Sequence, residues 1–194
     1  MCHRDPPIGG VAISIIMIAS SKTPRNDTIM EDEIYQRLLG FALNYVSIRP
    51  RSEQEIRTYI SKKITKWQVS YDLLEKVISR LTELGYVDDL KFAKAFISSM
   101  NRSRPKGRMR IRIELQKKGV SREAIESAQG LLQADEGYTD RDLARNTAIK
   151  KLRSLQRYDS LSRRTKLYSF LGRRGFDHTT ISSVIDELSP KGLQ

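Results

Sequence analysis

The segment VSYDLLEKVISRL, at residues 69–81, has two counterparts further along the chain. They are VSREAIESAQGLL at residues 120–132, displaced by 51 positions, and FDHTTISSVIDEL at residues 176–188, displaced by a further 56. Each begins with a helix-capping residue at its second position: Ser70, Ser121 and Asp177. The apolar residues recur at the spacing of one helix face. The aligned apolar sets are Val69/Val120/Phe176, Leu74/Ile125/Ile181, Val77/Ala128/Val184 and Leu81/Leu132/Leu188.

The same displacements align apolar residues in the two helical segments that precede each counterpart. One helix earlier Ile60, Ile111 and Leu167 coincide, and before that Phe41, Phe92 and Ala148. No alternating strand pattern interrupts them. The sequence therefore predicts an all-α fold, in which three tandem three-helix repeats form an elongated, curved array. Stacked helical repeats usually present extended binding surfaces and seldom enclose catalytic pockets.

This periodicity divides the chain into five parts. We expect an N-terminal extension at 1–33, repeats at 34–88, 89–134 and 141–190, and a linker at 135–140 between the second and third repeats. Within the extension, residues 8–19 read IGGVAISIIMIA, which is similar to a weak signal peptide. The alternative, which we favour, is a disordered or misassigned extension, with translation starting at Met30.

Polar breaks separate the first and second helices of each repeat. Ser52, Ser103 and Asp159 share one aligned position in these breaks, and Ser52 with Glu55 predicts a capping box. Gly119 and Gly175 end the second helix in repeats two and three, as expected for residues in the left-handed conformation. Residues 66–68 lack this glycine, so the corresponding turn of the first repeat is expected to differ in shape.

Charge favours an acidic partner. The 194 residues carry a net charge of +12, and residues 143–194 alone carry +7. Such a balance is typical of proteins that bind nucleic acid, although solubility also explains charged surfaces. A single cysteine excludes an intramolecular disulfide framework and fits a reducing, cytoplasmic location. No apolar run reaches the ~18 residues that cross a membrane.

Cations recur with the repeats. Arg57, Arg108 and Arg164 coincide, as do Lys66, Lys117 and Arg173, while Arg110 pairs with Lys166 and Lys118 with Arg174. Packing requires repeated apolar residues but no repeated cations, so a regularly charged polymer is a natural partner. The alternative is that cations favour helix C-termini, where they complement the helix dipole. This alternative applies best to Lys117, Lys118, Arg173 and Arg174.

Residues that suggest catalysis are few. Asp88-Asp89 allows a metal or acid/base interpretation, but we favour helix capping because no third ligand lies nearby in sequence. His178 follows a capping aspartate and has no evident ligand partners. No phosphate-cradling glycine loop or nucleophile motif is found. We therefore expect no enzymatic activity, no cofactor and no metal.

Four stretches of the chain form a recognisable set: residues 85–89 (GYVDD) with Phe92 and Phe96, residues 106–120 (KGRMRIRIELQKKGV), residues 49–53 (RPRSE) and residues 171–176 (LGRRGF). In their order and spacing they resemble the RecX family, bacterial regulators of the RecA recombinase. The resemblance implies tandem three-helix repeats. It also implies a non-enzymatic modulator that binds the RecA filament and DNA, and most often inhibits recombination and co-protease activity.

The resemblance supplies no catalytic residue, so the contact residues come from charge and repeat register. We expect a monomer that contacts the RecA filament and single- and double-stranded DNA through these cations: Arg104, Lys106, Arg108, Arg110, Arg112, Lys117, Lys118, Arg164, Lys166, Arg173 and Arg174. Two alternatives stay open. One is a stand-alone DNA-binding transcription regulator of helix-turn-helix type, and the other is an RNA-binding helical-repeat protein.

Overall fold

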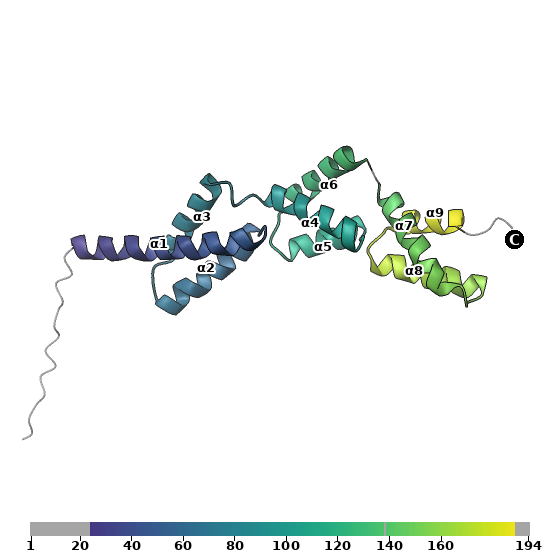
Figure 1. The fold of residues 1–194 in the computed structure, drawn as a ribbon, viewed down its shortest axis with the longest axis horizontal. Coiled ribbons are helices and arrows are strands. Elements are labelled where there is room, and N and C mark those ends of the chain that lie inside the picture. The colour runs from purple at the N-terminus through teal and green to yellow at the C-terminus, as the bar shows by residue number, and fades with distance from the viewer. Residues whose placement is uncertain (1–23, 138, 189–194) are drawn as a thin grey trace, which may run out of the picture. The chain divides into compact units, whose positions relative to one another are not determined.

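The computed structural model describes residues 24–137 and 139–188, and these residues form nine α-helices and one 3-10 turn, with no strand among them (Figure 1). The prediction of an all-α array of three-helix repeats is confirmed. Apart from the start of its first helix, the array lies in a unit of the chain that begins at Tyr35. The elements are α1 (Pro24–Ile48), α2 (Glu53–Trp67), α3 (Asp72–Glu83), α4 (Asp89–Ser103), α5 (Arg108–Gln116), α6 (Arg122–Glu136), α7 (Asp140–Leu152), η1 (Arg153–Leu155), α8 (Ser160–Arg173) and α9 (His178–Leu188).

Each repeat buries most of the apolar residues that align in the sequence. In the second repeat α4 and α5 pack against α6, and in the third α7 and α8 pack against α9. Leu74, Ile125 and Ile181, which share one aligned position, are all buried. The repeats therefore have equivalent cores.

Side-chain caps fix most helix starts. Ser52 begins α2 by accepting a hydrogen bond from the Glu55 amide at 3.2 Å, and Asp159 and Ser121 begin α8 and α6 in the same way. The predicted capping box is half formed, because the Glu55 carboxylate turns to Arg49 and Lys118. The alignment of Ser103 with these caps is wrong. Ser103 is the last residue of α4, and α5 begins only after Gly107.

The turn after the second helix of each repeat uses a left-handed residue. Gly119 and Gly175 adopt φ of 81° and 84°, as predicted. The expectation of a different turn in the first repeat is wrong, since Gln68 takes the same conformation at φ 55°. In all three turns the following residue donates a backbone hydrogen bond across the turn, as Val69 does to Ile64.

Two expected boundaries differ from the helices. α1 begins at Pro24, so helix covers residues 24–33 of the expected extension, while residues 8–19 lie outside the described residues. α6 continues to Glu136, which shortens the expected linker. Among the described residues, no helix combines the length and apolar character needed to cross a membrane.

Candidate nucleic-acid and protein interface

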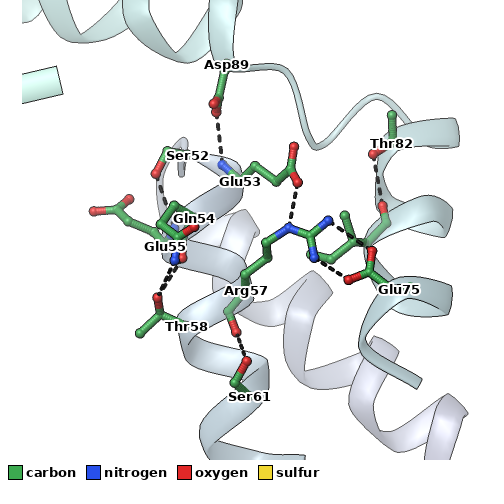
Figure 2. A network of polar contacts seen from close by, with 11 residues as sticks. Ser52, Glu53, Gln54, Glu55, Arg57, Thr58, Ser61, Glu75, Thr82 and Asp89 are labelled. Carbon is green, nitrogen blue, oxygen red and sulfur yellow. Dashed lines mark hydrogen bonds and ion pairs between the residues drawn. The ribbon is translucent and has the colours of Figure 1, made fainter. Parts of the chain in front are cut away.

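The first two repeats are joined at the start of α2. The Ser52 hydroxyl donates to the carbonyl of Lys118 at 2.6 Å, and the Lys118 ammonium lies 2.8 Å from the Glu55 carboxylate. The Glu53 amide donates to Asp89 at 2.9 Å, and Figure 2 shows Asp89 pointing toward Glu53, the first residue of α2. The first turn of α2 is thus capped partly by the next repeat.

The second and third repeats are joined in an equivalent way at the start of α5. The Gly107 amide donates to the carbonyl of Arg174 at 3.0 Å, and the Arg174 guanidinium donates to the Pro105 carbonyl at 2.9 Å. The Arg108 amide donates to Asp140 at 3.2 Å. Asp140 is the first residue of α7, as Asp89 is of α4, so the same kind of contact recurs at the start of the next repeat. Below, "junction" means either of these two sets of contacts.

Burial changes the titration of the junction acids. It raises the pKa of Asp89 and of Asp140 above the usual range, although each accepts a backbone hydrogen bond that acts in the opposite direction. Burial also opposes ionisation of Glu55, but hydrogen bonds from Arg49 and Lys118 hold its pKa below the usual range. Ionisation of the two aspartates therefore destabilises the folded state, whereas ionised Glu55 stabilises the junction.

One aligned series of cations is occupied within the protein. Arg57 bridges Glu53 and Glu75, each at 2.6 Å (Figure 2), and these hydrogen bonds raise its pKa further. Arg108 pairs with Asp140 and donates to Gln133. Arg164 pairs with Asp186 at 2.8 Å. The repeat register of this series suggested that it binds a charged polymer, but in the structure each of its arginines forms an ion pair between two helices.

Most cations of the second-repeat cluster also have acidic partners. Lys106 and Arg110 share the carboxylate of Glu114, at 2.6 and 3.0 Å. Arg112 lies 3.5 Å from Glu126. Surface pairs of this kind contribute about 0–1 kcal/mol each, so a phosphate can compete for them, but only by displacing the carboxylate.

The second aligned series is free. Lys66, Lys117 and Arg173 are exposed, and none has an acidic partner among the described residues. Arg104 is also exposed and unpaired within those residues, while the Lys166 ammonium lies 4.5 Å from the Tyr158 ring centroid. The free series thus supplies one cation per repeat at the end of the second helix, where the helix dipole also favours positive charge.

The contact residues predicted from the sequence therefore separate into groups. Six are ion-paired, Arg174 holds a junction, Lys166 lies over a ring, and Arg104, Lys117 and Arg173 are free. Their role as contacts stays a prediction. The prediction omitted Lys66, although its alignment with Lys117 is visible in the sequence. It also omitted the junction, because Asp89 and Asp140 are 51 positions apart and are not in register at the displacement of 56 between the second and third repeats.

The residues considered for catalysis have structural roles. Asp88 caps α4 by accepting from the Lys91 amide at 2.8 Å, and Asp89 caps α2 across the junction. The His178 ring lies edge-on to Tyr168, with centroids 5.7 Å apart. Within the described residues, no group of three His, Cys, Asp or Glu side chains is arranged to hold a metal ion.

These features define a class of protein: tandem three-helix repeats, fastened by recurring junctions, that present cations at repeated positions. Residues 88–128 match the profile described as the second three-helix domain of RecX, and residues 139–185 match its third three-helix domain. The regulatory protein RecX of Prosthecochloris aestuarii is 38% identical over 159 residues, covering 82% of this chain and 98% of that protein. The chain belongs to the RecX family of regulatory proteins.

Other relatives agree with this assignment. The regulatory protein RecX of Chlorobium phaeobacteroides is 32% identical over 162 residues, covering 82% of this chain and 98% of its own. The crystal structure of RecX from Lactobacillus salivarius has a TM-score of 0.69 at 22% identity, covering 81% of this chain and 97% of that chain. At that identity the structural likeness supports the fold.

Proposed function

We propose that this chain binds the RecA recombinase filament together with DNA, and that it lowers recombinase and co-protease activity in recombination, DNA repair and the SOS response. Membership of the RecX family of regulatory proteins supplies the regulatory role. The observation that carries the DNA-binding part is the free aligned series Lys66, Lys117 and Arg173, which is exposed in every repeat.

Free cations bind a polyanion more readily than paired ones. A phosphate that meets Lys117 releases condensed counterions without breaking an internal contact. A phosphate that meets Arg108 must replace contacts to Asp140 and Gln133, which also hold α5 to its surroundings. The free series is therefore the first place where a phosphate backbone binds, and the paired cations add to it at close range.

The inhibitory part follows from occupying two partners at once. A chain that contacts DNA phosphates and an acidic face of RecA blocks the position where the next RecA subunit would bind. It does so by binding alone, which needs no chemical step. A small amount of protein then affects a long filament, because each blocked end prevents all later additions.

The test removes the free series while preserving the junctions. The triple variant Lys66→Ala, Lys117→Ala, Arg173→Ala is compared with a control that loses the same charge from exposed lysines outside the series: Lys76→Ala, Lys91→Ala, Lys150→Ala. Binding to single-stranded DNA is measured by fluorescence anisotropy over a range of salt. The first triple should weaken binding and make the log–log salt slope shallower by about 2, at roughly 0.7 per phosphate, whereas the control should change it less.

The regulatory part is measured on the same proteins. RecA ATP hydrolysis on single-stranded DNA is followed with this protein well below the RecA concentration. We expect inhibition by the wild type and the control, and a loss of inhibition in the free-series triple. An equal loss of inhibition in both triple variants would mean that net charge alone, and not the position of the free series, causes the effect. No effect of the wild type on the filament, combined with tight binding to duplex DNA, would refute the RecA proposal and favour a stand-alone DNA-binding protein.

A further inference from the structure

The third repeat contains a groove of about 610 Å³ that the proposed function does not use. Its walls come from the end of α7, from η1, from the start of α8 and from the end of α9. Ile149, Leu152, Leu161 and Leu167 supply apolar surface, and Leu161 is 73% exposed. Contiguous apolar surface in an open groove commonly marks a binding site, and Leu161 extends that surface at the edge of the groove.

The equivalent place in the earlier repeats is covered by the next repeat. Leu161 is the second residue of α8, as Gln54 is of α2, and the Gln54 side chain lies against Gly119. Arg110, near the start of α5, lies against Gly175 in the same manner. The groove of the third repeat is thus the docking face of a repeat that has no successor among the described residues. In repeat arrays a face that no repeat covers is normally polar, but here this face carries Leu161.

The surroundings of the groove are basic. Arg153, Arg163 and Arg164 line it, and residues 143–194 carry a net charge of +7. At the two junctions a carboxylate accepts from the first amide of the second helix, as Asp89 does from Glu53. Among the described residues no carboxylate is hydrogen-bonded to the corresponding amide of Ser160. An occupant that brings both leucine-like and acidic side chains would complement this surface.

A second copy of this chain does not complement it. Leu38, inside the continuous helix α1, occupies the position in the first repeat that aligns with Asp89, so no carboxylate stands there. Gln68 replaces the glycine that allows close approach at each junction, and Asp159 replaces the Ser52 hydroxyl with an acceptor. The first repeat of another copy therefore lacks the groups that make a junction.

We infer that the groove at Leu161 binds a segment of a partner protein in which apolar side chains are flanked by carboxylates. This binding goes beyond the proposed function, because it uses neither Lys66 nor Lys117 and is independent of DNA. The occupant takes the place that the following repeat holds at the two junctions: its apolar side chains cover Leu161, and its carboxylates meet Arg153 and the first turn of α8.

The probe is a fluorescein-labelled helical peptide of about 14 residues, with leucines spaced i, i+3, i+4, i+7 and glutamate or aspartate elsewhere. Two control peptides replace either the leucines by serine or the acids by glutamine. Binding to the full chain is measured at near-physiological salt for the wild type, Leu161→Ser and Arg153→Glu. The control variant is Leu131→Ser, which changes a leucine of α6 that is 44% exposed.

We expect Leu161→Ser and Arg153→Glu each to weaken binding by about tenfold, and Leu131→Ser to leave it unchanged. Both control peptides should bind more weakly than the probe, and Leu161→Ser should bind DNA as the wild type does. Equal binding of the serine peptide would reduce the effect to charge and overturn the inference. Two results would assign the groove to another occupant: tighter probe binding after removal of residues 189–194, or self-association that Leu161→Ser abolishes.

Discussion

Replacing Gly119 by alanine tests whether the repeats are joined as described. The backbone there has φ of 81°, where an L side chain costs about 1–2 kcal/mol. An added Cβ would also collide with the Cβ of Gln54, on the other side of the junction. Overpacking of this kind costs about 1–3 kcal/mol. We therefore expect Gly119→Ala to lower the free energy of unfolding by roughly 2–5 kcal/mol.

A matched control separates the two costs. Gly85 has φ of 74° but nothing within 4 Å of an added Cβ, so Gly85→Ala should cost only the backbone contribution of about 1–2 kcal/mol. Both variants are measured by urea unfolding followed by circular dichroism, with native hydrogen exchange to locate the opening. Gly119→Ala should also speed exchange in the first turn of α2. If the two variants lose the same free energy within about 0.5 kcal/mol, the close approach of Gln54 and Gly119 is refuted.

Other predictions use the same measurements. Gln68→Gly should raise the free energy of unfolding by up to about 1 kcal/mol, because it relieves a left-handed glutamine; a decrease would contradict the turn geometry. Asp140→Ala should cost about 1–2 kcal/mol by leaving the Arg108 amide unpaired, whereas Asp140→Asn keeps an acceptor and removes a buried charge, so it should be neutral or stabilising at pH 7. Because the pKa of Asp140 is raised, the free-energy cost of its buried charge appears as the pH rises from 3.8 through the raised value. The stabilising effect of Asp140→Asn should therefore vanish near pH 3, where the aspartate is protonated. The charge of Glu55 has the opposite effect on stability, because its pKa is lowered in the folded protein. Glu55→Gln should therefore cost about 1 kcal/mol of unfolding free energy above pH 4.5, and progressively less as the pH falls below that value.

The helices and their cores could be predicted from the sequence, because the positions that a helix buries are apolar in every repeat. Leu74, Ile125 and Ile181 occupy one position, and all three are buried. Capping residues gave most helix starts, but a fixed displacement assumes that each repeat has helices of equal length. α5 breaks that assumption. Pro105 disfavours helix at the residue before it, so α4 ends at Ser103 and the Ser103 hydroxyl bonds back to Ser99.

The turn at Gln68 was mispredicted for a different reason. Glycine is the usual left-handed residue, and its absence suggested a new turn shape. The backbone contacts around the turn are nevertheless the same, with Val69 bonded to Ile64 as Val120 is to Leu115. Two backbone hydrogen bonds and the flanking cores hold Gln68 in a conformation that its side chain disfavours. A single-residue preference is therefore outweighed by the contacts on both sides.

The pairing of the cations could not be predicted from repeat register. Register placed Arg57, Arg108 and Arg164 together, but their acidic partners Glu75, Asp140 and Asp186 lie at separations of 18, 32 and 22 residues and follow no common displacement. These partners become visible only when the helices are packed. The sequence thus predicts where cations recur, and the fold decides which of them remain available to a ligand.

Two of the three residues of the free series, Lys117 and Arg173, owe their exposure to the junctions. Lys118 and Arg174 each stand just before the left-handed glycine, and each turns its carbonyl toward the preceding repeat. Successive residues of a helix point about 100° apart, so Lys117 and Arg173, one position earlier, lie off the junction and stay exposed. The contact that fastens one repeat to another therefore also sets a free cation beside it. The junctions fix the positions of Lys117 and Arg173, so loosening a junction should weaken binding of a polymer to the free series even where every cation is retained.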